Sequence, residues 1–261
     1  MRQLFAFLLL LLFAMPGLAL GAVSPTLSAK PAVAAPGLPA GWTLLANGAI
    51  AYVPAPLHPV PMPLVVLLHG YSEHADEFIS VFTKEADSRG ILLLALQSKD
   101  VTWDLVPRHD GGDDPLTMKT GRSLRFGADI ARIDATLKEM FARTRVDARH
   151  IILLGFSDGA GYALSLGLAN PQLFSTVLAF SPGFVVIPKM VAPSQHIFIA
   201  HGRQDQILPF RVAEKDIAGL IAANGLKPVF HPFDGNHHID KSALDAGLDY
   251  ALGTGGAAPG L

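Results

Sequence analysis

Ser157 lies between two glycines in the segment Gly155-Phe156-Ser157-Asp158-Gly159, directly after an apolar run and before a stretch of helical character. A sharp strand-to-helix turn requires small residues, because side chains at positions 155 and 159 would clash with neighbouring backbone. Such a turn lifts the serine hydroxyl above the sheet edge, beside the N–H groups and partial positive charge of a helix amino terminus. The segment therefore predicts a nucleophilic serine. The alternative is an ordinary strand-to-helix turn.

A serine hydroxyl is a weak nucleophile until a base takes its proton, so this hypothesis requires a histidine. Five histidines follow the serine: His196, His201, His231, His237 and His238. The first three flank or lie within runs that are typical of strands, which favours a structural role for them. The last two follow the turn-rich segment 233–236, on a loop from which a base can reach over the edge of a sheet.

The acid is expected on the loop that follows the preceding strand-like run, Ile197 to Ala200. Asp205 lies on that loop, where its carboxylate would hold the imidazole in the right tautomer and stabilise the imidazolium. Two competitors are weaker. Asp234 is so close to His237 in sequence that it better serves the turn, and Asp216 lies inside a predicted helix, where solvation is expected.

The oxyanion that forms when serine attacks a carbonyl needs two N–H donors. One is expected to be the backbone N–H of Asp158, the residue after the nucleophile. The second is assigned to the backbone N–H of Tyr71, in the segment His69-Gly70-Tyr71-Ser72 that follows the apolar run Leu64 to Leu68. We interpret His69 as a structural histidine whose ring bonds loop backbone.

Short apolar runs alternate along the chain with longer amphipathic stretches, and runs of this length suit strands buried on both faces of a parallel sheet. The strands are expected at 64–68, 91–96, 151–154, 176–180, 197–200 and 228–231, and the helices at 75–89, 127–143, 158–169, 211–223 and 239–251. Asn47-Gly48 predicts a hairpin between 42–45 and 49–53. The order predicts an α/β fold, with a mostly parallel central sheet and helices on both faces.

Four segments together resemble the α/β hydrolases, in particular the secreted esterase and polyhydroxybutyrate-depolymerase-like branch and the phospholipase/carboxylesterase family. They are His69-Gly70-Tyr71, Gly155 to Gly159, His201-Gly202-Arg203-Gln204-Asp205 with Leu208-Pro209, and Gly235-Asn236-His237-His238-Ile239. The resemblance covers about residues 60 to 250. It implies an α/β-hydrolase fold, a serine esterase that cleaves carboxylic esters without a cofactor, and a triad of Ser157, Asp205 and His237. In such families the histidine follows a Gly-x pair, which selects His237 over His238.

Asp158 departs from the glutamine that phospholipase/carboxylesterase members usually carry after the nucleophile, and its side chain adds a possible negative charge that disfavours long anionic substrates. Thr102-Trp103-Asp104 resembles the depolymerase-like branch, where this segment lies near the mouth of the site. We expect Trp103 and Phe184 to line the substrate pocket. The alternative, that both are ordinary core or rim residues, fits the sequence equally well. Residues 98–125 show no clear element, and a loop of that length is usually functional, for example as a lid, or disordered.

The composition fits one globular domain, with 16% charged residues in a chain of 261. A net charge of -2 shows no basic excess that would indicate nucleic acid as a partner. The chain has no cysteine, whereas the depolymerase-like branch often uses cysteines, and no appended polymer-binding domain is recognisable. A soluble or oligomeric ester is therefore a better candidate substrate than a crystalline polymer. Nothing in the sequence fixes the oligomeric state.

The amino-terminal residues have the layout of a secretory signal peptide: Arg2, an apolar run from Leu4 to Met15, and small residues before Ala22. An apolar run of twelve residues is short for a membrane span, which needs about 20. We therefore expect a signal peptide over 1–21, a secreted or periplasmic location and no stable membrane anchor after cleavage. A flexible leader is expected over 22–40, the catalytic domain over 41–252, and a flexible tail over 253–261.

Other chemistries are less well supported. Carboxylates at 110–114 could bind calcium, but they lack the EF-hand spacing, and no histidine pattern typical of zinc appears, so no metal is expected. A serine peptidase or amidase on the same scaffold stays open, because esters and amides pass through the same kind of tetrahedral intermediate. A non-catalytic binding protein of this fold is a third possibility.

Overall fold

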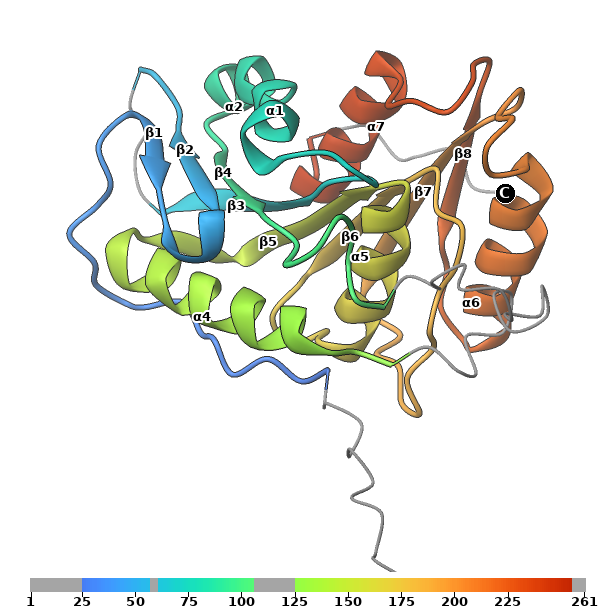
Figure 1. Cartoon of the computed structure of the whole chain (residues 1–261), viewed down its shortest axis with the longest axis horizontal. Coiled ribbons are helices and arrows are strands. Elements are labelled where there is room, and N and C mark those ends of the chain that lie inside the picture. Colours follow the sequence, from blue (N-terminus) through green and yellow to red (C-terminus); the bar gives the residue numbers. More distant parts are fainter. Residues whose placement is uncertain (1–24, 57–60, 106–124, 255–261) are drawn as a thin grey trace, which may run out of the picture.

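The computed structural model describes residues 25–56, 61–105 and 125–254 (Figure 1). In these residues eight strands form one sheet, in the order β1-β2-β4-β3-β5-β6-β7-β8. The strands are β1 (Gly41–Leu44), β2 (Ile50–Val53), β3 (Met62–Leu68), β4 (Leu92–Leu96), β5 (Val146–Phe156), β6 (Thr176–Phe180), β7 (His196–Gly202) and β8 (Val229–Phe233). The expected signal peptide, the acidic residues at 110–114 and most of the 253–261 tail lie outside the described residues.

The sheet is mostly parallel, which confirms the expected fold class. Strands β3 to β8 pair in parallel, and only β1–β2 and β2–β4 are antiparallel. The hairpin between β1 and β2 turns through η1 (Ala46–Gly48), a single 3₁₀ turn. Asn47 and Gly48 have φ of 60° and 74°, the left-handed backbone that Asn and Gly adopt most readily.

Helices cover both faces of the sheet (Figure 1). They are α1 (Ala75–Ser80), α2 (Thr83–Arg89), α4 (Ala128–Arg143), α5 (Asp158–Ala169), the π-helical turn η2 (Val212–Ala218), α6 (Gly219–Ala223) and α7 (Lys241–Leu252). The apolar side chains of α4 and α5 pack in one core layer, and those of α1, α2 and α7 in the other. No helix of the described residues is long and apolar enough to cross a membrane.

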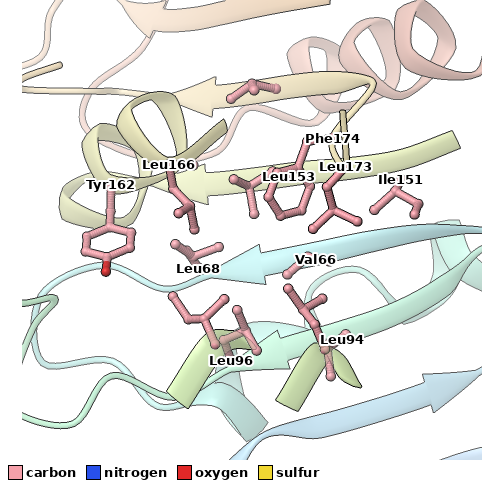
Figure 2. Close-up of a cluster of buried hydrophobic side chains, with 14 of the residues drawn as sticks. Val66, Leu68, Leu94, Leu96, Ile151, Leu153, Tyr162, Leu166, Leu173 and Phe174 are labelled. Carbon is pink, nitrogen blue, oxygen red and sulfur yellow. The ribbon is translucent and has the colours of Figure 1, made fainter. Parts of the chain in front are cut away.

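Strand β3 shows why the central runs are apolar throughout. Leu64, Val66 and Leu68 belong to the core layer with α5, whereas Val65 and Leu67 belong to the opposite layer. Successive strand residues point to opposite faces, so a strand covered on both sides must be apolar at every position. Figure 2 shows the first layer, where strand side chains meet Tyr162 and Leu166 of α5.

Two expected helices differ in the structure. The stretch 75–89 is divided into α1 and α2, because Val81 and Phe82 donate to carbonyls three residues back and tighten the end of α1. This break places Phe82 in the core, edge-on to Phe78. The predicted stop at Gly90 is confirmed by its φ of 67°. The stretch 211–223 contains the π-helical turn η2 before α6.

Residues 25–40, expected to be a flexible leader, are held against α4 and α5. As expected, these residues contain no helix or strand. Nevertheless, Asp134 of α4 accepts hydrogen bonds from the backbone N–H of Ser28 and Ala29 at 2.7 and 2.8 Å. The buried Asn170 side chain accepts from Leu27 N–H and donates to the Pro25 carbonyl, each at 2.8 Å. The flexible leader stays a prediction, while side chains far away in sequence bind the backbone of residues 25–29.

Candidate active site

The turn that carries Ser157 joins β5 directly to α5. Ser157 has φ of 55° and ψ of -119°, a strained conformation for a residue with a side chain. Its N–H donates to the Phe180 carbonyl at 2.9 Å, which ties the turn to the end of β6. A Cβ on Gly155 would lie 2.1 Å from the Gly159 carbonyl oxygen, and one on Gly159 would lie 2.2 Å from the Leu68 oxygen. Both glycines are therefore sterically required.

The structure brings Ser157, His237 and Asp205 into one hydrogen-bonded row. His237 Nε2 lies 2.9 Å from Ser157 Oγ, and His237 Nδ1 lies 2.7 Å from Asp205 Oδ2. The three residues follow the carboxyl ends of β5, β7 and β8, which lie at the same edge of the sheet. This is the edge where ligands bind in open parallel sheets. A base in contact with the serine and an acid behind the base is an arrangement suited to nucleophilic catalysis.

Asp205 is buried with its carboxylate fully hydrogen-bonded. Its Oδ1 accepts from the backbone N–H of Ile207 and of Leu208, both at 2.9 Å, and its Oδ2 faces His237. Burial acts to raise the pKa of this carboxyl, but the hydrogen bonds from His237, Leu208 and Ile207 outweigh burial and hold the pKa below its usual value. The carboxylate is therefore ionised at neutral pH.

The loops that carry Asp205 and His237 are joined through backbone. Arg203 N–H donates to the Phe233 carbonyl at 2.9 Å, and Gln204 N–H donates to the Gly235 carbonyl at 3.0 Å. A Cβ on Gly202 would lie 2.3 Å from the Gly235 oxygen, so the loops approach as closely as glycine allows. This contact fixes the loop of Asp205 relative to the loop of His237.

The neighbouring histidines lie in structural environments. The ring of His238 packs edge-on to Phe233, with ring centres 5.2 Å apart, while His237 contacts the serine. His231 stacks on Phe198, with ring centres 5.4 Å apart. His196 is exposed at the start of β7. Of the five histidines after Ser157, His237 is therefore the one in hydrogen-bond contact with its hydroxyl.

His69 holds the backbone of its own loop, as the sequence predicted. Its Nδ1 lies 2.7 Å from the Gly70 carbonyl oxygen, and its Nε2 accepts from Ser98 N–H at 3.2 Å. A carbonyl oxygen only accepts, so the proton is on Nδ1 and the ring is neutral. Burial lowers the pKa of His69, which agrees with that state.

Tyr71 and Asp158, expected to supply the two oxyanion N–H groups, lie on neighbouring segments. Tyr71 follows Gly70 in the loop after β3, its side chain is exposed, and its N–H has no hydrogen-bond partner within the described residues. Asp158 is the first residue of α5, so its N–H lies at the amino terminus of that helix. The pairing of Leu68 with Gly155 in the sheet places the two segments side by side.

The segment 98–105 contacts both the loop that contains Tyr71 and the turn that contains Asp158. Thr102 Oγ1 donates to Asp158 Oδ2 at 2.8 Å, which gives the unusual Asp158 side chain a defined contact. The Trp103 indole N–H donates to the His69 carbonyl at 2.8 Å, and Ser72 N–H donates to the Val101 carbonyl at 2.9 Å. The segment thus holds both expected oxyanion donors through side-chain and backbone contacts.

Trp103 and Phe184, expected to line the pocket, are packed in the core. Trp103 is 1% exposed and contacts the rings of His69 and Tyr162. Phe184 is 5% exposed, and its ring fills the space next to Gly161, where a Cβ would lie 2.4 Å from Phe184 Cε1. Of the two readings left open by the sequence, the structure favours core residues. Most of the 98–125 segment, expected to be a functional or disordered loop, lies outside the described residues.

The described residues contain no group of three or more metal-binding side chains close enough to hold an ion.

Residues 55–250 match the phospholipase/carboxylesterase family. The chain belongs to this family. Its fold is that of the α/β hydrolases, and the crystal structure of esterase PE8 superposes on it with a TM-score of 0.58 at 23% identity, over 84% of this chain and 98% of that one.

Two curated proteins are similar in sequence to this phospholipase/carboxylesterase family member. One is named as esterase NocK of Nocardia uniformis subsp. tsuyamanensis, 28% identical over 60% of this chain and 44% of NocK. The other is esterase YpfH of Escherichia coli strain K12, 29% identical over 54% of this chain and 66% of YpfH. The matches therefore span less than two thirds of either relative.

Two residues of this family member touch the site and were not singled out in the sequence for that role. The ring of Phe156 packs on the imidazole of His237, with ring centres 4.9 Å apart. His201 lies 3.2 Å from Asp205 Oδ2 through its Nε2. The signal for Phe156 was its place beside the serine. His201 gave no comparable signal. It begins the His-Gly segment before Asp205, but a histidine within a strand-like run is typical of a structural core residue.

Proposed function

We propose that this protein is an exported carboxylic-ester hydrolase that uses Ser157, His237 and Asp205 as a catalytic triad. The observation that carries this proposal is the hydrogen-bonded row from Ser157 Oγ through His237 to Asp205. Membership of the phospholipase/carboxylesterase family supports the ester as substrate class. Two relatives that are named esterases support it as well.

In the acylation step, Ser157 Oγ attacks the acyl carbon while His237 Nε2 takes the hydroxyl proton. The carbonyl oxygen becomes an oxyanion, which accepts hydrogen bonds from the backbone N–H groups of Tyr71 and Asp158. When the tetrahedral intermediate collapses, the C–O bond to the alcohol breaks and His237 gives its proton to the leaving oxygen. Asp205 keeps the imidazole oriented and stabilises its cationic form.

Deacylation reverses these roles with water. His237 takes a proton from water, the hydroxide adds to the acyl carbon, and the bond to Ser157 Oγ breaks. The serine oxygen recovers its proton from His237, and the products are a carboxylic acid and an alcohol. The Asp158 carboxylate next to the nucleophile favours neutral acyl groups over anionic ones, because like charges repel.

Kinetics with short and long p-nitrophenyl esters and an aminoacyl anilide test this function. We expect hydrolysis of the esters, and a loss of about 10³-fold or more in kcat for Ser157→Ala and His237→Ala. His238→Ala is the matched control, because this exposed neighbour packs on Phe233, and it should retain wild-type activity. Preference for the anilide would indicate a peptidase or amidase. Activity that survives in Ser157→Ala would overturn the mechanism.

Export rests on the sequence of residues 1–21. The test is to express the full chain in a bacterial host, fractionate the cells and sequence the amino terminus of the product. We expect a mature protein outside the cytoplasm that begins near Ala22. Intact protein in the cytoplasm, with the apolar run retained, would contradict export.

A further inference from the structure

His201 is a fully buried residue near the end of β7, and its ring reaches the acid of the site. His201 Nε2 lies 2.8 Å from the Leu208 carbonyl oxygen and 3.2 Å from Asp205 Oδ2. A carbonyl oxygen only accepts hydrogen bonds, so Nε2 carries the proton. The N–H therefore donates to the Leu208 carbonyl, and Asp205 Oδ2 lies 3.2 Å from the same nitrogen without a hydrogen bond.

The charge state of His201 follows from its surroundings. Its other ring nitrogen, Nδ1, is buried without a hydrogen-bond partner in the part of the chain that the structure describes. A protonated ring would place a second N–H there with no acceptor, which is costly in a buried site. Burial lowers the pKa of His201 despite the neighbouring carboxylate, and the ionisable groups that act on it are Asp205 and His237. The ring is therefore a neutral donor.

A neutral donor suits the task of an acid behind a catalytic histidine. Asp205 Oδ1 is held by the N–H groups of Ile207 and Leu208, whereas Oδ2, the oxygen that faces His237, has no backbone donor. A lysine or arginine at position 201 would fix Oδ2 but cancel the negative charge that stabilises the imidazolium of His237. A neutral imidazole that donates to the Leu208 carbonyl holds the loop whose N–H groups bind Asp205, and it leaves the negative charge in place.

We propose that His201 is a positioning residue, whose Nε2–H holds the Leu208 carbonyl and so fixes the loop whose N–H groups bind the Asp205 carboxylate. The inference rests on the proposed function, since it assigns a role within that triad. It predicts that His201 acts on the rate and on its pH dependence, through Asp205 and His237, rather than on substrate binding.

The competing interpretation is that His201 only fills space in the core, where its ring packs edge-on to Phe210. Three substitutions separate the two interpretations. His201→Gln keeps an N–H donor at a similar distance from the backbone, His201→Met fills the space without a donor, and His201→Asn keeps an amide that is too short to reach. If His201→Met does not fold, His201→Asn takes its place as the variant without the donor.

We expect His201→Met to lower kcat about tenfold with little change in KM, because the loop that holds Asp205 loses its hydrogen bond to His201. Without that hydrogen bond the Asp205 carboxylate is held less firmly and stabilises the imidazolium of His237 less strongly. The acid limb of the kcat/KM profile should therefore move to lower pH. His201→Gln should stay within about threefold of wild type and keep the wild-type profile.

Melting temperature and NMR titration of the His237 ring, followed in the same variants without substrate, complete the test. A His237 titration that moves to lower pH in His201→Met but not in His201→Gln supports the proposal even if none of the chosen esters is hydrolysed. Failure of the proposed function would appear separately, as a wild type without serine-dependent hydrolysis. Equal losses in His201→Gln and His201→Met that follow their melting temperatures, or unchanged titration in both, would overturn the positioning role.

Discussion

The carboxylate of Asp205 combines deep burial with a full set of hydrogen-bond donors. Burial by itself would favour the neutral acid, but donors from Ile207, Leu208 and His237 favour the charged form and lower the pKa. A group with a lowered pKa in the folded state stabilises the fold above its ordinary pKa. That stabilisation is lost as the pH falls through the lowered value, so Asp205 links the chemistry of the site to acid stability.

Asp205→Asn tests this link. The wild type should be more stable than the variant at pH 7, and the difference should persist down to the ordinary pKa of Asp, about 4, and shrink below it. Urea denaturation of both proteins at several pH values between 7 and 3 measures the difference. Asp234→Asn is the matched control, because its carboxylate is 87% exposed. A difference between wild type and Asp205→Asn that does not change with pH would contradict the account.

Local segments were enough to predict the three residues of the row, because each follows an apolar run that ends at the same sheet edge. The contact between Thr102 and Asp158 could not be predicted in this way. It joins positions 56 residues apart, and no periodicity marks it. His201 was set aside because a histidine within a strand-like run is usually structural, and its reach to Asp205 depends on the path of the following loop.

The strand–turn–helix element around Ser157 depends on close backbone contact at Gly155 and Gly159. Both glycines approach carbonyl oxygens so closely that no side chain fits. This contact holds Ser157 in its strained backbone conformation and sets the first residue of α5 beside the loop that contains Tyr71. Rigidity of this element therefore underlies the geometry of the nucleophile.

Gly155→Ala should lower the free energy of unfolding by about 3 kcal/mol or more and remove activity, since the new Cβ would force backbone apart. Gly219→Ala is the matched control. An added Cβ there meets nothing within 4 Å, and its helical backbone predicts a gain of about 0.5–1 kcal/mol. Chemical denaturation measures both. A stable, active Gly155→Ala protein would contradict the described turn.

The segment 98–105 is a second element with a testable role. Thr102→Val keeps the shape of the side chain and removes its hydrogen bond to Asp158. We expect kcat/KM to fall roughly threefold to tenfold, with the melting temperature nearly unchanged. Thr83→Val, which removes a hydrogen bond to the Ser80 carbonyl instead, should leave ester hydrolysis unaltered. Equal activity in the two variants would argue against a positioning role for the segment.

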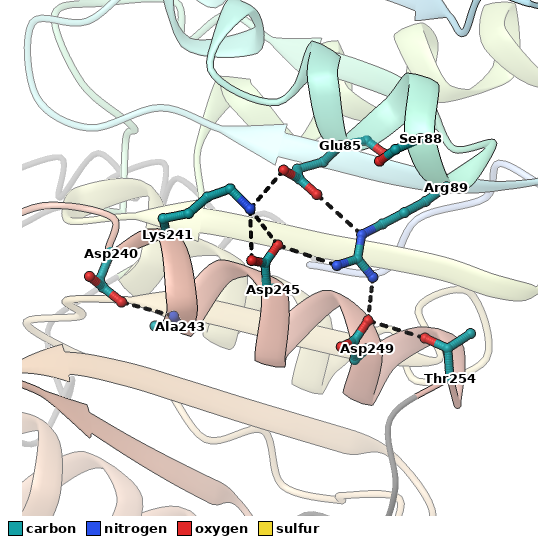
Figure 3. Close-up of polar contacts among 9 residues, drawn as sticks. All are labelled: Glu85, Ser88, Arg89, Asp240, Lys241, Ala243, Asp245, Asp249 and Thr254. Carbon is teal, nitrogen blue, oxygen red and sulfur yellow. Dashed lines mark hydrogen bonds and ion pairs between the residues drawn. The ribbon is translucent and has the colours of Figure 1, made fainter.

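At the scale of the whole molecule, helices far apart in sequence are joined over one face of the sheet. Arg89 of α2 contacts Glu85 on its own helix and Asp245 and Asp249 on α7, and Lys241 of α7 contacts Glu85 and Asp245 (Figure 3). This network connects the layer around α1 and α2 to the helix that follows the loop of His237.

Arg89→Gln should lower the free energy of unfolding by about 1 kcal/mol, because the partly exposed pairs are screened by solvent. The melting temperature should fall by a few degrees, less so in high salt, with unchanged activity at room temperature. Arg149→Gln is the control, since this 83% exposed arginine pairs with Asp147 on its own strand and, in the described part of the chain, with no other acid. Equal melting temperatures for the two variants would contradict a stabilising network.

The order and type of the central elements could be predicted because continuous apolar runs have few other interpretations in a chain of this kind. The path of residues 25–40 could not, because the groups that hold it, Asp134 and Asn170, lie more than a hundred positions away. The same is true of the division between α1 and α2. There, the helical periodicity continues across residues 81 and 82, but the chain breaks the helix and buries Phe82 in the core.

The central claim, that Ser157 is a nucleophile activated by His237, is tested most directly by covalent labelling. The wild type, Ser157→Ala and His237→Ala are each treated with a fluorophosphonate, and the products are measured by intact and peptide mass spectrometry. We expect one adduct per wild-type chain, located on Ser157, no adduct on Ser157→Ala, and much slower labelling of His237→Ala. A wild type that takes up no label, or a label on another residue, would contradict the claim.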